Sequence, residues 1–192
     1  MGSIKDQPTV EFTSRAEWEA WLDANHASSP GLWLKLAKKG SGFVTISRPD
    51  ALEVALCYGW IDGQANSLDE AYWLQRFTPR TRRSKWSQIN REAVTKLIES
   101  GQMKPAGLAE VEAAQKDGRW DAAYASPRNI AVPEDLTAKL SEHPGALALF
   151  EQLDSRNRYA ILYRIAEAKK AETRLRRIEK YVAMLLKGER IY

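Results

Sequence analysis

The sequence lacks most of the residues from which metal, disulfide and redox sites are built. Its 192 residues contain one cysteine, Cys57, and two histidines, His26 and His143. A single cysteine cannot form an internal disulfide or a CxxC motif, which fits a reducing compartment, so we expect the protein in the cytoplasm. With so few sulfur and imidazole ligands we expect no metal site.

Several familiar motifs and patterns are also missing. The GxGxxG, GxxxxGK[ST], HExxH and GxSxG motifs do not occur, so the common phosphate-loop, zinc-protease and hydrolase signals are missing and we expect no cofactor. No apolar run reaches the ~18 residues of a membrane span, and the N-terminus has no basic and apolar export signal, which predicts no membrane insertion. Twenty-nine basic residues against 25 acidic ones give a net charge of only +4, so any anion binding must come from a local patch.

What the chain does have is apolar mass, with 44% hydrophobic residues and seven tryptophans, enough for a substantial core. Its first part alternates helical and extended patterns. In order, they predict a strand at 10–12, a helix from a Thr13 or Ser14 cap to Ala24, a strand at 31–39, a helix from Pro49 to Gly59, a turn at the WIDG sequence and a strand at 71–79. This order predicts an α+β fold with a small antiparallel or mixed sheet.

The rest of the chain is predicted to be helical. One helix follows Ser87 and stops at Gly101, with a stripe of Ile89, Ala93, Val94, Leu97 and Ile98, and a second covers 104–118. The segment 124–135, rich in proline, serine and asparagine, reads as a linker. Four helical segments follow, at 133–140, 144–153, 155–169 and 171–187. We therefore predict an α+β domain over 1–124 and an all-helical region over 125–192.

The last predicted helix has one apolar and one basic side. Leu175, Ile178, Val182 and Leu185 recur at steps of three and four residues and are expected to pack inward. The opposite side is expected to carry Arg176, Arg177, Lys180 and Lys187. Part of this charge supports the helix itself, because Glu172 and Arg176 form an i,i+4 pair.

Two small groups of residues are candidates for catalysis. Cys57 and a histidine could form a thiol dyad, but Cys57 lies in an apolar helix pattern that favours a buried, inert thiol. In YGWIDGQ, the carboxylate of Asp62 lies beside Gly63, Tyr58 and Trp60, which indicates either a cleft with Asp62 as general acid or base, or a plain turn with Trp60 in the core.

The stretch FTPRTRRSKWSQIN, at 77–90, holds four basic residues and no acid. Arg80, Arg82, Arg83 and Lys85 precede a predicted helix whose N-cap is Ser84 or Ser87, and a helix start favours anions. Trp86 offers either a stacking surface or a core residue. We predict a ligand-binding site for an anion made by Trp60, Asp62, Arg80, Arg82, Arg83, Ser84, Lys85 and Trp86; the alternative is a solvated basic loop.

Several dispersed motifs together resemble a known family. These are GWIDG, RFTPR, S-x-WS-x-IN, GQMKPAGL, DGRWDAAY, PEDL and AKKAETRLRRIEKYV, in that order. The pattern is similar to that of YdeI/OmpD-associated proteins, also called bacteriocin-protection proteins, from about Trp33 to Glu189. Ala171 and Lys104 depart from it, where proline and threonine are expected.

The resemblance implies a role in resistance to bacteriocins or cationic antimicrobial peptides and an association with an outer-membrane porin. It supplies no catalytic residue. Our first hypothesis is a non-enzymatic binding or stress-protection protein whose cationic surface, including Arg174, Arg176 and Arg177, engages a small anionic ligand or an anionic macromolecule. The alternatives are a protein-interaction module that docks through the C-terminal helices, and an enzyme centred on Asp62.

Overall fold

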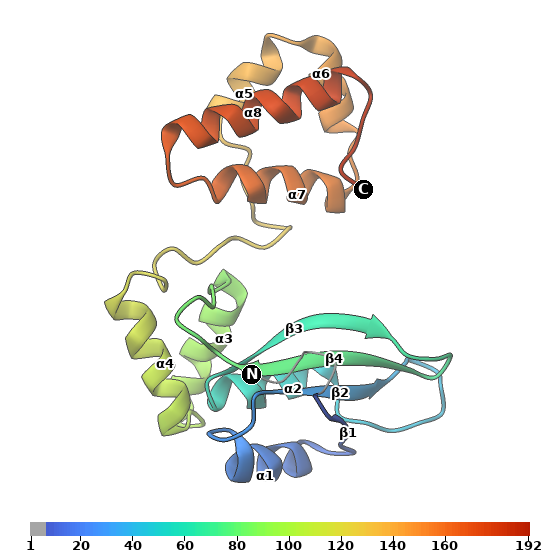
Figure 1. Ribbon diagram of the computed structural model, residues 1–192, viewed down its shortest axis with the longest axis vertical. Coiled ribbons are helices and arrows are strands. Elements are labelled where there is room, and N and C mark those ends of the chain that lie inside the picture. Colours follow the sequence, from blue (N-terminus) through green and yellow to red (C-terminus); the bar gives the residue numbers. More distant parts are fainter. Residues whose placement is uncertain (1–6) are drawn as a thin grey trace. The chain divides into compact units, whose positions relative to one another are not determined.

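The computed structural model describes residues 7–192, which form two compact units. The first unit ends at Ala123 and the second comprises Tyr124–Tyr192. The first holds four strands and four helices (Figure 1): β1 (Thr9–Glu11), α1 (Arg15–Asn25), β2 (Leu32–Ala37), α2 (Arg48–Cys57), β3 (Trp60–Ser67), β4 (Tyr72–Pro79), α3 (Gln88–Glu99) and α4 (Pro105–Lys116). The predicted α+β class is confirmed.

The strands form one mixed sheet in the order β1-β2-β4-β3. β1 runs parallel to β2, while β4 pairs antiparallel with both β2 and β3. Because side chains alternate along a strand, Leu32, Leu34 and Leu36 of β2 face the same side, and all three are buried. α1 and α2 cover that side (Figure 1), so the main core lies between them and the sheet.

Local capping explains where the helices of this unit begin. Ser14 caps α1 by accepting a hydrogen bond from the amide of Glu17, and the Glu17 carboxylate accepts one from the amide of Thr13 in return. Ser47 caps α2 and Ser87 caps α3 in the same way. Trp18 then extends from α1 into the core, where its Nε1 donates to the carbonyl oxygen of Ala51 at 3.0 Å.

The prediction of a turn at WIDG is wrong, because these residues open β3. Trp60 pairs with Pro79 and Asp62 pairs with Phe77, and the irregularity comes just afterwards as a shift of register between Asp62 and Ala65. The buried amide of Gln75 donates to the carbonyl oxygens of Gly63 and Gln64, at 3.0 and 3.2 Å. This partner from β4 stabilises a bulge that would otherwise leave two carbonyl groups without ladder bonds.

The second unit is a bundle of four helices, as predicted: α5 (Glu134–Ser141), α6 (Pro144–Glu151), α7 (Ser155–Ala166) and α8 (Ala171–Leu186). They share a core of their own, which includes Leu136, Phe150, Ile161, Val182 and Leu185. Asp154 caps α7 by accepting from the amide of Asn157 at 2.7 Å. The bundle therefore has the separate apolar core that defines a domain.

Three residues of the predicted apolar stripes are exposed. Ile89 and Ile98 of α3 are 54% and 41% exposed, and Leu175 of α8 is 55% exposed. At about 100° per residue, Ile89 and Ile98 lie on opposite edges of the arc centred on Val94 and Leu97. In each helix, the neighbouring elements cover the centre of the apolar stripe and leave the edges of the stripe in solvent.

The approach of α4 to α2 supplies a stability prediction. A Cβ atom added at Gly107 would lie 2.2 Å from the carbonyl oxygen of Cys57, which also accepts from the amide of Lys104 at 3.1 Å. We expect Gly107→Ala to destabilise the first unit by about 1–3 kcal/mol, because backbone must move to admit the methyl group. Chemical denaturation measures this.

Gly63→Ala is the matched control, because its added Cβ would meet only the carbonyl oxygen of Arg76, at 3.9 Å. We expect this variant to change stability by less than about 0.5 kcal/mol. If Gly107→Ala raised stability instead, as alanine does at an open helix position, the close approach of α4 to α2 would be wrong.

Candidate functional site

The loop between β4 and α3 is held by a tight turn. The amide of Ser84 donates to the carbonyl oxygen of Thr81, and the amide of Thr81 donates to the Ser84 hydroxyl, both at 2.9 Å. The amide of Arg83 donates to the Thr81 hydroxyl. The Ser84 side chain, predicted as a ligand, therefore holds the loop in shape, and the helix cap falls to Ser87, whose hydroxyl accepts from the amide of Asn90 at 3.1 Å.

Arg80 is buried beneath this loop. Its amide donates to the carbonyl oxygen of Gly59 at 2.9 Å, and its guanidinium lies 3.5 Å from the centre of the Trp86 ring. One guanidinium nitrogen also donates to the carbonyl oxygen of Lys85, at 3.3 Å. Only 5% of Arg80 is exposed. Arg80 and Trp86 thus form an internal cation-π stack that supports the loop from below.

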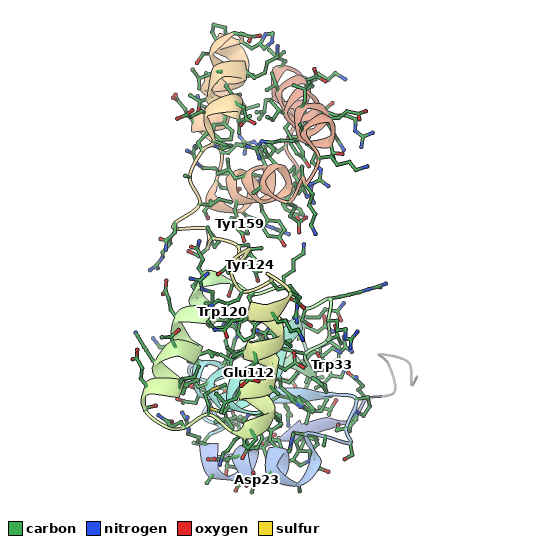
Figure 2. The ribbon with its side chains drawn as sticks, turned by 90° about the vertical axis from the view of Figure 1, so that its left-hand side faces the viewer. Asp23, Trp33, Glu112, Trp120, Tyr124 and Tyr159 are labelled. Carbon is green, nitrogen blue, oxygen red and sulfur yellow. The ribbon has the colours of Figure 1, made fainter. Side chains whose placement is uncertain are left out.

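Two residues from a distant segment complete the support. Trp120, labelled in Figure 2, follows α4 in the chain and meets the Trp86 ring edge to face at 4.9 Å. Arg119 donates to the carbonyl oxygens of Thr81 and Ser84, at 3.4 and 3.1 Å, and pairs with Asp117 at 2.8 Å. Our sequence interpretation missed both residues, although DGRWDAAY was part of the resemblance. The reason is that Arg119 is separated from Ser84 by 35 positions in the sequence.

The remaining basic residues of the loop point outward. Arg82, Arg83 and Lys85 are exposed, just before the positive end of α3. Asp117 brings one carboxylate to this group, and its pKa lies below the usual range because of the hydrogen bonds from Arg119 and, more weakly, the charge of Arg82. We call Arg82, Arg83 and Lys85, on the turn held by Arg80 and Arg119, the arginine loop. Its net charge is strongly positive.

The residues of the predicted Asp62 cleft have separate partners. Trp60 is buried against the rings of Trp18 and Trp21, and its Nε1 donates to the carbonyl oxygen of His26. Asp62 pairs with Arg48, with 2.5 Å between oxygen and nitrogen. Both side chains face the core side of the sheet, but Trp60 lies inside the core and Asp62 lies at the edge of the core.

Tyr58 and Asp62 have different partners. Tyr58 follows α2 and donates its hydroxyl to Asp23 of α1, with 2.5 Å between the oxygens. Burial, together with Asp23, raises the pKa of Tyr58. Burial likewise raises the pKa of the Cys57 thiol, which favours the inert interpretation of this cysteine.

Two of the three arginines proposed for a cationic surface on α8 connect helices instead. Arg174 pairs with Asp135 of α5, at 2.5 and 2.8 Å, and donates to the carbonyl oxygen of Ile165. Arg177 donates to the carbonyl oxygen of Arg164 on α7, so its expected projection into solvent is wrong. Arg176 is exposed.

Residues 7–192 contain no group of three or more histidine, cysteine, aspartate or glutamate side chains arranged to hold a metal ion. Within the same range, no helix has the length and apolarity needed to cross a membrane.

Comparison with known families gives two matches. Residues 10–110, more than half of the chain, match the model described as domain of unknown function DUF8412. Residues 129–188 match the model described as bacteriocin-protection, YdeI or OmpD-associated, so the resemblance first seen over most of the sequence is confirmed for this C-terminal part. No curated protein and no solved structure matches the chain.

The Asp135–Arg174 pair predicts a pH dependence of stability. The hydrogen bonds from Arg174 lower the pKa of Asp135 in the folded state. Between the two pKa values, the folded protein therefore binds fewer protons at Asp135 than the unfolded chain does. The contribution of Asp135 to the stability of the fold is fully present above its unfolded pKa of about 4, and it is lost as the pH falls through its folded pKa. Because Asp135 is about half exposed, we expect it to contribute less than about 1 kcal/mol.

The Asp135→Asn variant should lose less stability than the wild type as the pH is lowered. Thermal unfolding curves recorded across the acidic range measure this difference. Glu134→Gln is the control, because Glu134 is the neighbouring exposed carboxylate and makes no ion pair within the described part of the chain. Identical acid profiles for wild type and Asp135→Asn would contradict the assignment.

Proposed function

We propose that this chain, which belongs to the DUF8412 family and carries a YdeI or OmpD-associated region, is a non-enzymatic protein that binds an anionic ligand at the arginine loop. The descriptions of the two families name no reaction. The observation that carries the proposal is the way in which this loop is held. Arg82 and Arg83 extend from a turn closed by its own hydrogen bonds and supported by Arg80, Trp86 and Arg119.

Support of this kind distinguishes the arginine loop from an ordinary solvated one. A basic loop that served only solubility would gain nothing from an internal guanidinium stack and an arginine bonded to two of its carbonyl groups. Holding like charges together has an electrostatic cost, which a bound anion would offset. A loop that is already ordered also loses less conformational entropy when a ligand binds.

The type of anion follows from the residues offered. Arginine presents a planar fork that matches carboxylate and phosphate oxygens, and the start of α3 adds its positive end. The exposed set is small, so we favour a compact anion over a long polyanion. A protective role in the cytoplasm is part of the proposal, supported by the bacteriocin-protection family of the C-terminal part and by the single cysteine.

The alternatives have less support. A protein-interaction role for the C-terminal helices is favoured by the exposed Leu175 and Leu186 of α8. The enzyme hypothesis lacks a gathered site, because Asp62 pairs with Arg48 while Trp60 and Tyr58 contact other residues.

The test is calorimetric titration of the full chain with pyrophosphate and with citrate, as compact anions of two chemistries. The double variant Arg82→Glu, Arg83→Glu should weaken binding by more than about tenfold, because it replaces two attractive charges by two repulsive ones. Binding to the wild-type protein should also weaken as salt is added.

The control variant is Lys39→Glu, Lys96→Glu, which changes the net charge equally at two exposed lysines of the same unit. It should bind like the wild type. The proposal fails if neither anion binds in the millimolar range, or if the control loses as much affinity as the loop variant. Tighter, length-dependent binding of a single-stranded oligonucleotide would replace the compact anion by a nucleic acid.

A further inference from the structure

The C-terminal unit contains a cavity that the proposed function does not use. Its volume is about 590 Å³, larger than the cavities of about 270, 390 and 440 Å³ in the first unit. It lies along α7, and its lining includes Arg156, Tyr159, Tyr163, Arg164 and Tyr192. We call it the tyrosine cavity. Pockets for small molecules commonly measure about 300–1,000 Å³.

Helical spacing explains why these residues gather. Arg156, Tyr159, Tyr163 and Arg164 follow one another at steps of three, four and one, so they share one side of α7. The other side carries Ile161 and Ile165, which are fully buried in the bundle core. Ala160, also in the lining, is small and leaves room between the larger side chains. α7 thus has a core side and an aromatic, basic side.

The aromatic walls are held in place by their neighbours. Tyr159 donates its hydroxyl to the carbonyl oxygen of Ala125 at 3.2 Å, and its ring lies 5.6 Å from that of Tyr163. Tyr163 in turn meets Tyr124 edge to face at 5.4 Å. Tyr159 extends from α7, and Tyr124 comes from the segment that precedes α5 (Figure 2). A fixed wall costs little entropy on binding.

Tyr192 is held by a buried side chain. Asn157 is 2% exposed, and its Oδ1 accepts hydrogen bonds from the amides of Ile191 and Tyr192, at 3.0 and 2.9 Å. These bonds attach the backbone at Tyr192 to α7, while 60% of the residue stays exposed. Its ring therefore borders the cavity without being part of the core.

The charges around the cavity select among aromatic ligands. Arg156 lies 4.0 Å above the Tyr192 ring, and Arg164 lines the cavity one turn beyond Tyr159 and Ala160. Glu167 is the one side-chain carboxylate of the lining, so the charged side chains there, two arginines and one glutamate, leave a positive balance. An aromatic cage for a cationic ligand requires the opposite balance, and Arg156 already occupies the cation position on Tyr192. Rings for stacking beside arginine forks match a planar, negatively charged ligand.

We propose that the tyrosine cavity binds a small molecule that combines an aromatic ring with an acidic group, either a carboxylate or a phosphate. The ring lies against the tyrosines and the acidic group meets Arg156 or Arg164. This site is separate from the arginine loop and does not depend on it.

Two probes carry the full combination, and two others carry only half of it. Adenosine monophosphate and 4-hydroxyphenylacetate each join a ring to an acidic group, whereas adenosine lacks the acid and inorganic phosphate lacks the ring. We expect one or both combined probes to bind the full chain more tightly than either half, in calorimetric titration. If only adenosine monophosphate binds, the acidic group of the ligand is a phosphate. If only 4-hydroxyphenylacetate binds, it is a carboxylate.

Variants locate the site. Arg164→Gln and Tyr192→Ala should each weaken the combined probe by about tenfold, and the second keeps the backbone bonds to Asn157. Tyr192→Phe should bind like the wild type, because the ring is retained. Arg176→Gln, which removes an exposed arginine of the same unit outside the cavity, is the control for net charge.

Failure here can be told apart from failure at the arginine loop. Binding that survives in Arg82→Glu, Arg83→Glu but is lost in Arg164→Gln supports the tyrosine cavity. Binding lost only in the loop variant overturns it, because the acidic group would then be held elsewhere. The proposal is equally overturned if no combined probe binds, or if Arg176→Gln weakens binding as much as Arg164→Gln.

Discussion

The contact between Arg80 and Trp86 is the interaction on which the arginine loop depends. Arg80 is attached to the start of β3 through the carbonyl oxygen of Gly59, and Trp86 directly precedes the cap of α3. Their stack at 3.5 Å therefore joins the end of the sheet to the start of a helix. A guanidinium suits this place because it is flat and weakly hydrated, so it stacks on an indole at a smaller desolvation cost than an ammonium group.

The arginines of this protein have several distinct roles. The number of arginines is therefore a poor measure of how much cationic surface the protein exposes. Arg119 supports a loop through backbone carbonyl groups, and Arg174 and Arg177 join α8 to neighbouring helices. Arg82 and Arg83 remain exposed. A net charge of only +4 therefore says little about binding, because structural pairing decides which charges reach a ligand.

Local patterns allowed much of the fold to be predicted. Ser14 and Ser87 were identified as possible caps because a cap forms within three residues of the helix that it starts. The four C-terminal helices were predicted for a similar reason, since helical periodicity is local. The candidate site was predicted less completely: Arg82 and Arg83 are on the surface as expected, but Ser84 closes a turn and Trp60 lies in the core.

The sequence by itself determined the fold class, the order of helices and strands, and the residues with the chemistry to bind an anion. These depend on interactions between residues a few positions apart, which a linear pattern records. Only the tertiary structure decided that WIDG opens a strand, that Arg119 holds the Thr81–Ser84 turn, and that Tyr192 borders a cavity along α7. Each of these contacts joins segments far apart in the chain, and whether two such segments meet depends on the packing of the whole core.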